Sequence, residues 1–214
     1  MDHLEPKKWH NTWEAAATTQ GVNQACARFS GGVSANQRSA IRLTHYTESV
    51  KMETTPIDRF KLNFDASIFL DGGTSRVGAI LRNDRGAVMA ALLAKGPPVM
   101  GSEEAEIFAC CRAVEFAVEC GFLELVLEGD NQALMDALNK RKGLSSWLGH
   151  ILQDVLCMLD RLRWVQVVFV KRSTNSVVHV LARYAKDLVE DIVWIEDSPP
   201  PVVEALYFDS VSVE

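Results

Sequence analysis

The chain has 214 residues, of which 48% are hydrophobic and 23% are charged, a balance typical of a folded globular protein rather than a disordered one. No apolar run approaches the roughly 18–20 residues that a membrane-spanning helix requires, and the first residues lack the apolar stretch of a secretory signal. We therefore expect an intracellular protein of the cytoplasm or nucleus, without a secretory or transmembrane segment.

Charge and cysteine content exclude further classes of function and of site. The net charge of −6 argues against a general nucleic-acid coat, because lysine and arginine must neutralise phosphates. The excess acid lies beyond residue 60, where it either covers a solvated surface or converges on a metal. The five cysteines show no CxxC or CxxH spacing, so we expect neither a disulfide framework nor a zinc site.

The domain organisation follows from where regular patterns begin. Residues 1–58 contain a polar Gly/Ser stretch at 30–37 and a proline near their end, and we expect an N-terminal arm or linker that is partly disordered. The folded domain is expected over residues 59–190. An acidic tail with prolines follows over 191–214, and its apolar residues, Trp194 and Val202 among them, are candidates to pack back on the domain.

Within the domain, alternation of apolar and polar residues predicts a half-buried strand over 60–67. Two more strand-like runs, 77–81 and 87–93, are joined by a hairpin that contains glycine. The later elements are expected as a helix from an N-cap at Ser102 to 119, a strand over 123–127, helices over 130–139 and 145–162, a strand over 165–170 and a helix over 175–188. Tightly joined strands pair antiparallel and strands separated by helices lie parallel to a neighbour. The sequence therefore predicts an α/β fold, a mixed five-stranded sheet with helices on both faces.

Three carboxylates stand out by position. Asp65 lies within a strand, where Asp is disfavoured, although a solvent-facing place on an edge strand would also explain it. Glu106 lies on its helix opposite the exposed stripe expected for Arg112 and Glu115, so it faces inward unless the first turn reaches solvent. Asp130 follows the end of a strand, where open α/β sheets bind ligands, although a helix N-cap is an equally complete explanation.

These acids carry more weight together than singly. Neighbouring strands with Asp65 and Asp130, crossed by the helix with Glu106, would bring three carboxylates into one place. At ~4 Å and an effective dielectric near 20, each pair repels by roughly 4 kcal/mol, so such a group needs protons or a divalent cation. Oxygen ligands suit Mg²⁺ or Mn²⁺, and paired ions recur in phosphodiester hydrolysis. A structural domain with solvated acids is the remaining alternative.

Five ordered motifs resemble the plant ribonuclease H type 1-like domain, which is related to the RNase H region of non-LTR retroelement reverse transcriptases. They are Lys61–Ser67 (KLNFDAS), Gly78–Gly86 (GAILRNDRG), Ala105–Ala109 (AEIFA), Glu128–Asn131 (EGDN) and Asn175–Ala182 (NSVVHVLA). The resemblance covers about residues 59–188. It implies a ribonuclease H-like fold with strand order 3-2-1-4-5 and metal-dependent endonucleolytic cleavage of RNA in RNA–DNA hybrids, leaving a 3′-hydroxyl and a 5′-phosphate.

The resemblance also implies site residues. It places catalytic, metal-binding acids at Asp65, Glu106 and Asp130, with Mg²⁺ or Mn²⁺ as cofactor, and a fourth catalytic position at His179. Ribonuclease H enzymes usually carry Asp at that position, whereas the plant group often has His. A neutral imidazole adds no negative charge to a Mg²⁺ site, and the loop before Asn175 lacks the histidine with which the family begins it. The alternative function is therefore a domesticated retroelement domain that binds nucleic acid or protein with little or no turnover.

Nucleic acid, expected as an RNA–DNA hybrid, must meet this acidic domain through local positive charge. The candidate contacts are Lys171, Arg172, Asn175, Arg183 and Lys186. Affinity is expected to be modest and salt-dependent, with contacts to shape and 2′-hydroxyls rather than to bases. Lys140–Lys142 beside Trp147 form a second candidate patch, which a solvated helix end would equally explain.

Overall fold

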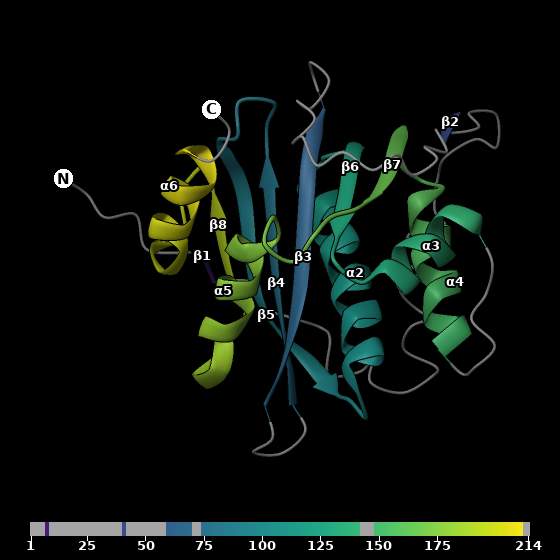
Figure 1. Cartoon of the computed structure of the whole chain (residues 1–214), viewed down its shortest axis with the longest axis horizontal. Helices are drawn as coiled ribbons and strands as arrows, with labels where there is room; N and C mark the ends of the chain where they lie inside the picture. Colours follow the sequence, from purple (N-terminus) through teal and green to yellow (C-terminus); the bar gives the residue numbers. More distant parts are fainter. Residues whose placement is uncertain (1–6, 9–39, 42–58, 70–73, 142–147, 212–214) are drawn as a thin grey trace.

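A computed structural model describes residues 7–8, 40–41, 59–69, 74–141 and 148–211. The arm expected over residues 1–58 therefore lies almost entirely outside the described residues. Within the described part, eight strands form one mixed sheet in the order β1-β8-β5-β4-β3-β6-β7-β2 (Figure 1). Their bounds are β1 Lys7–Lys8, β2 Ala40–Ile41, β3 Phe60–Phe69, β4 Thr74–Arg82, β5 Val88–Pro98, β6 Glu124–Gly129, β7 Trp164–Phe169 and β8 Ile192–Ile195.

The central strands confirm the predicted fold. β3, β4 and β5 form an antiparallel meander, and β6 and β7 follow in parallel on the other side of β3. Numbered as the five predicted strands, this is the order 3-2-1-4-5. The sheet is wider than predicted because β8 pairs antiparallel with β5, and two-residue strands pair outside β8 and β7.

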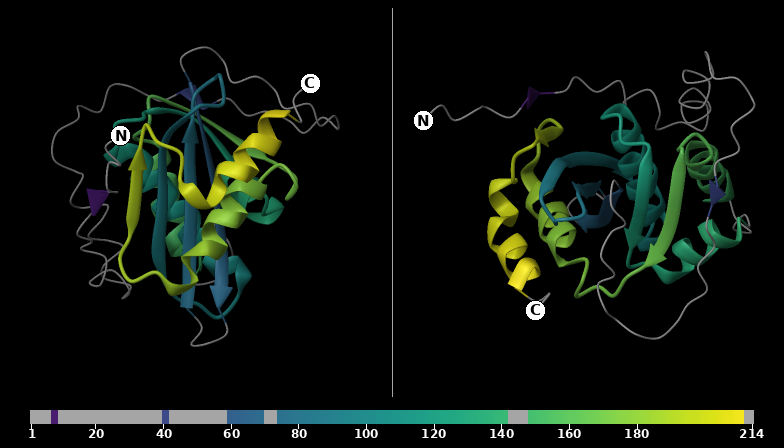
Figure 2. Two further views of the ribbon diagram at one scale, coloured as in Figure 1. Left: turned by 90° about the vertical axis from the view of Figure 1, so that its left-hand side faces the viewer. Right: turned by 90° about the horizontal axis from the view of Figure 1, so that it is seen from above.

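Helices cover both faces of the sheet (Figures 1 and 2). α2 (Ser102–Glu119), α3 (Gln132–Lys140) and α4 (Leu148–Leu159) share one large apolar core with Leu62 and Phe64 of β3. On the opposite face, α5 (Ser176–Tyr184), η2 (Ala185–Asp187), η3 (Pro200–Val202) and α6 (Val203–Val211) surround a smaller core that includes Trp194 and Val202. Among the described helices, none is long and apolar enough to cross a bilayer.

The central strand β3 is buried on both faces, whereas a half-buried strand was expected. Its polar residues Lys61, Asn63 and Asp65 are only 9%, 1% and 3% exposed. Their face is buried because β3 has a strand on each side and α5 packs across it. The alternating apolar and polar residues of β3 thus face an apolar core on one side and a buried polar layer on the other, and neither face is open to solvent.

Two helix starts differ in detail from the prediction. Gly101, not Ser102, occupies the N-cap of α2, and the carboxylate of Glu104 accepts a hydrogen bond from the Met100 amide at 2.8 Å. At α3 the side-chain oxygen of Asn131 accepts from the Leu134 amide at 3.1 Å, which satisfies one of the unpaired donors of the first turn. The capping role therefore belongs to Asn131 and not to Asp130.

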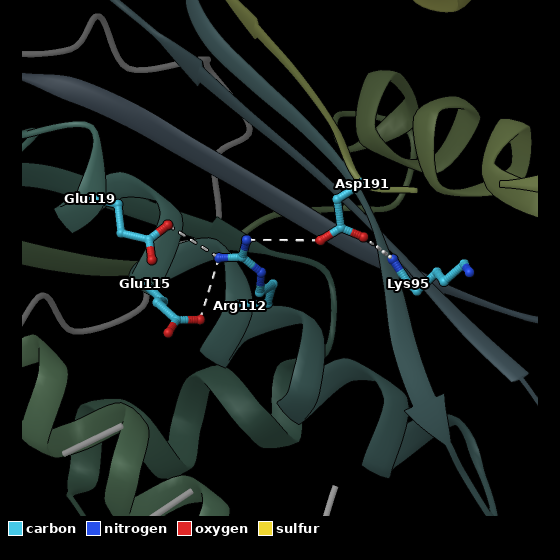
Figure 3. Close-up of polar contacts among 5 residues, drawn as sticks. All are labelled: Lys95, Arg112, Glu115, Glu119 and Asp191. Atoms are coloured by element: carbon cyan, nitrogen blue, oxygen red, sulfur yellow. Dashed lines mark hydrogen bonds and ion pairs between the residues drawn. The ribbon is translucent and has the colours of Figure 1, made fainter. Parts of the chain in front are cut away.

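Arg112 was expected on the exposed stripe of its helix but is 6% exposed, and it forms the centre of a charged cluster (Figure 3). Its Nη1 lies 3.3 Å from Glu115 and 3.5 Å from Glu119, and its Nη2 lies 3.9 Å from Asp191. Asp191 in turn accepts a hydrogen bond from the Lys95 amide at 2.9 Å. This Arg112 cluster ties α2 to β5 and to the segment that leads into β8.

Candidate metal centre

The site forms where the pairing of β3 with β6 ends. The last paired residues are Asn63 and Glu128, and Asp65 and Asp130 lie two residues further along their respective strands. Parallel register therefore brings both acids to the same level, at the carboxyl end of β6. At this point the strand order reverses direction, which is where open α/β sheets bind ligands.

Two side chains occupy the β3 edge that β6 leaves uncovered. Asn175, which precedes α5, donates its amide nitrogen to the Phe64 carbonyl at 2.9 Å. Glu106, in the second turn of α2, is hydrogen-bonded by the Ala66 backbone. Backbone groups left over at the end of a ladder require partners, and these two polar side chains supply them.

Asp65, Glu106 and Asp130 come together in the structure. One carboxylate oxygen of each lies within 4.8 Å of the others, a separation at which two ionised groups repel by about 3–4 kcal/mol at an effective dielectric near 20. Asp65 is buried, so a solvent-facing place for it is wrong. The repulsion must be relieved by protons or by a cation.

The electrostatics of the cluster fit a cation. Burial, and next the charges of Asp65 and Asp130, raise the pKa of Glu106 to about 9. Its Oε2 atom is buried without a hydrogen-bond partner. Burial and the Asp65 charge also raise the pKa of Asp130, while Arg172 and a hydrogen bond from Asn175 oppose that rise. A carboxylate oxygen without a hydrogen-bond partner, placed among acids that repel one another, is a ligand of the kind that a hard divalent cation binds.

His179 reaches this cluster from α5, one turn after Asn175. Its Nδ1 lies 2.7 Å from Oδ2 of Asp65. The approach depends on Gly78, which pairs with Asp65 across β3 and β4. A Cβ atom at Gly78 would lie 2.7 Å from both the Val178 carbonyl oxygen and the Ala182 amide nitrogen. Glycine at this position therefore allows the α5 backbone to rest directly on the sheet.

The five residues expected to contact nucleic acid divide into two groups. Lys171, Arg172, Arg183 and Lys186 are exposed, and Arg172 is close enough to Asp130 to lower the pKa of that carboxyl. Asn175 differs from the expectation of a nucleic-acid contact, because it is 1% exposed and its amide is engaged inside the protein.

The second patch is largely neutralised by neighbouring acids. Lys140 lies 3.1 Å from Asp136, and Arg141 pairs with Asp160. Lys142 and Trp147 lie outside the described residues. These ion pairs favour the solvated helix end over a nucleic-acid contact.

Sequence reasoning missed a buried polar group beside the acids. Lys61 lies 3.3 Å from Glu128, and Asn63 contacts both Glu128 and Arg82. Their spacing in the sequence could have predicted the contact between Asn63 and Glu128. Each stands two residues before an acid of the cluster, on strands predicted to be neighbours. Polar residues placed in register on adjacent central strands indicate a shared internal layer.

The family of the chain follows from a match to residues 63–185. Over this stretch, more than half of the sequence, the chain matches the family model described as reverse transcriptase-like. The chain belongs to the reverse transcriptase-like family. The matched region of this reverse transcriptase-like domain runs from β3 to η2 and contains all three acids and His179. No curated protein matches the sequence.

Solved structures show the same fold for the reverse transcriptase-like domain. RNase H1 from Halobacterium salinarum NRC-1 superposes with a TM-score of 0.53 at 23% identity, covering 60% of this chain and 98% of that one. An N-terminal RNase H domain from Mycobacterium tuberculosis gives 0.55 at 18% identity, covering 60% and 94%. LC11-RNase H1, isolated from compost and solved in complex with an RNA/DNA hybrid, gives 0.54 at 16% identity, covering 60% and 96%. The domain is therefore RNase H-like in fold.

Proposed function

We propose that this protein is a Mg²⁺-dependent endonuclease that hydrolyses the RNA strand of RNA–DNA hybrids by two-metal catalysis. Asp65, Glu106 and Asp130 would hold the ions, Mg²⁺ or Mn²⁺, and His179 would stand at the fourth catalytic position. The observation that carries the proposal is the meeting of three carboxylate oxygens within 4.8 Å at the strand-order reversal of an RNase H-like fold.

The residues of the cluster have distinct roles in this proposal. When bound, the metal ions supply Lewis-acid stabilisation of the attacking and leaving oxygens of a phosphodiester. Asp65 is held in orientation by its 2.7 Å contact with His179, as second groups commonly hold metal ligands. The unpartnered Oε2 atom of Glu106 is available as a ligand. Asp130 is only partly buried and would face the substrate side.

Nucleic acid would be attracted by the exposed basic residues beside the cluster. Lys171 and Arg172 lie in the loop between β7 and α5, and Arg183 and Lys186 follow along the same helix and η2. Because the net charge is −6, these few cations would have to offset a repulsive background, and binding would be strongly salt-dependent. The hybrid-bound LC11-RNase H1 supports an RNA–DNA hybrid as the substrate class.

The alternative proposal is a domain that binds nucleic acid or protein with little or no turnover. One observation favours it: the fourth position holds an imidazole whose Nδ1 engages an oxygen of Asp65 at 2.7 Å. A neutral imidazole contributes no negative charge to a hard-ion site. In this proposal, metal affinity is too weak to support hydrolysis.

The deciding experiment is cleavage of an end-labelled RNA–DNA hybrid with Mg²⁺ or Mn²⁺. Wild type should cut the RNA strand, and Asp65→Asn should lower the rate by about 100-fold or more, as expected when a group acting in the transition state is removed. Asp136→Asn is the matched control, because Asp136 lies on α3 and pairs with Lys140.

Activity that survives Asp65→Asn would overturn the metal assignment. Hybrid binding without cleavage at any Mn²⁺ concentration would instead establish the binding domain. RNA fragments that carry a 3′-hydroxyl and a 5′-phosphate would match the proposed reaction.

A further inference from the structure

The buried polar layer behind the metal centre is organised around Asn63. This side chain, 1% exposed, contacts groups from three different elements. Arg82 of β4 donates Nη2 to its Oδ1 at 2.9 Å. Asn63 then donates Nδ2 to Glu128 Oε2 of β6 at 2.9 Å and to Oδ1 of Asn175 at 3.4 Å. Asn63 itself is not one of the three clustered acids.

The chemistry of these partners fixes the orientation of the Asn63 amide. A guanidinium can only donate hydrogen bonds and an ionised carboxylate can only accept them. The oxygen of Asn63 must therefore face Arg82, and its NH₂ group must face Glu128 and Asn175. Turning the amide over would set nitrogen against guanidinium and oxygen against carboxylate.

The orientation of Asn175 is fixed in the same way, by a donor on one side and acceptors on the other. Because Oδ1 of Asn175 accepts from Asn63, its NH₂ group points the other way. That group donates to the Phe64 carbonyl at 2.9 Å, and the side chain of Asn175 is also hydrogen-bonded to Asp130. The hydrogen bonds thus run in one direction, from Arg82 through Asn63 and Asn175 to Asp130.

We propose that Asn63 is a positioning residue which, through Asn175, holds Asp130 toward Asp65 and Glu106 in the divalent-cation site. The inference rests on the proposed function and deepens it. Without Asn63, Oδ1 of the buried Asn175 loses its donor. A buried acceptor without a donor is costly, so Asn175 would shift to recover one and would move its amide away from Asp130.

The test measures binding of Mn²⁺ alone by isothermal titration calorimetry, well below the unfolding temperature. Asn63→Leu removes the amide, and Asn63→Ser, which is uncharged and shorter, cannot reach Asn175. Both should weaken Mn²⁺ binding by about tenfold, the lower range for loss of an outer-shell partner. Arg112→Met is the control: it breaks the buried ion pair between α2 and Asp191, outside the hydrogen-bonded layer of Asn63, and should lower Tm without changing the Mn²⁺ Kd.

A double-mutant cycle tests the route through Asn175. Asn175→Leu should weaken Mn²⁺ binding, and adding Asn63→Leu to it should cause no further loss, because both changes remove the same interaction. Losses that multiply would show that Asn63 does not act through Asn175 and would overturn the proposal. A purely structural role predicts lower Tm in every variant with unchanged Mn²⁺ affinity.

The outcomes separate this proposal from the proposed function. Wild-type protein that binds no Mn²⁺ would overturn both. Wild-type binding, with equally tight binding by the folded Asn63 variants, would overturn only the positioning role. If Asn63→Leu does not fold, the smaller and uncharged Asn63→Ser decides the question by the same measurement.

Discussion

The Nδ1 atom of His179 lies 2.7 Å from Oδ2 of Asp65, so the imidazole contacts a buried carboxylate of the candidate metal centre. The contact joins α5 to the middle of β3, and it places a side chain without negative charge beside the three acids. Metal affinity and the stability of the metal-free protein should both respond to the charge of this side chain.

His179→Asp should make the metal-free protein less stable and its response to Mg²⁺ larger. A fourth carboxylate adds like-charge repulsion in the absence of metal and an anionic ligand in its presence. The measurement is Tm with EDTA and with Mg²⁺, and His179→Asn is the neutral control. The same Mg²⁺-induced rise in Tm for both variants would contradict the prediction.

Glu106→Gln should stabilise the metal-free protein at about pH 8 and have little effect near pH 5. The folded pKa of Glu106 is raised from 4.5 to about 9, so the folded state holds a proton that the unfolded state releases. Ionisation of Glu106 therefore lowers the free energy of unfolding as pH rises from 4.5 to about 9, and glutamine abolishes that loss. Denaturant unfolding in EDTA at the two pH values measures the free energy of unfolding. Asp65→Asn is a less direct test, because it also changes the contact with His179.

Gly78→Ala should lower the free energy of unfolding by about 1–3 kcal/mol, the usual range for overpacking. The added methyl group would meet the α5 backbone at 2.7 Å, and α5 carries His179. The imidazole signals in NMR spectra should therefore shift as well. Gly101→Ala, where a Cβ meets nothing within 4 Å, is the control and should leave those signals in place.

Arg112→Met should lower the free energy of unfolding by about 3 kcal/mol, because it leaves buried carboxylates without their cation. Burial raises the pKa of Glu115 and of Asp191, so protonation at low pH should lessen the loss. Unfolding at about pH 5 and about pH 8 tests both statements. Lys140→Met, which breaks an exposed pair, should cost less than about 1 kcal/mol.

Replacing Lys171 and Arg172 together by Gln should weaken hybrid binding and flatten its salt dependence. Each lost phosphate contact reduces the slope of log K against log[salt] by about 0.9. Fluorescence anisotropy in EDTA at several KCl concentrations gives the slope. Lys140→Gln is the control, and an equal change of slope in that variant would show that the effect is not local.

Local patterns predicted the fold because each central element carries its own signal. Alternation marked β3, and the helices between later strands required parallel pairing. The burial of Lys61 and Asn63 could not be predicted in the same way, because it depends on Arg82 and Glu128, which arrive from other strands. Arg112 was placed on the surface by helical periodicity, since its partner Asp191 is supplied only when the chain returns to pair with β5.

The end of β6 is a second place where the local sequence does not determine the structure. Asp130 and Asn131 are both good N-cap residues, and the local sequence cannot choose between them. The choice follows from the register of β6 with β3, which turns Asp130 to Asp65 and leaves Asn131 to begin α3. Asp65 and Glu106 stood out in the sequence because each contradicts the expected polarity of its own element, and Asp130 stood out because it follows the end of a strand.

The pairing of β8 with β5 has a consequence for any shortened version of this polypeptide. Ending the chain at residue 190 would strip the hydrogen-bonding partner from Ala90–Leu93, which pair with Ile192–Ile195. A bare, apolar strand edge recruits strands from other molecules. Preparations lacking the last 24 residues should therefore precipitate or form fibrils.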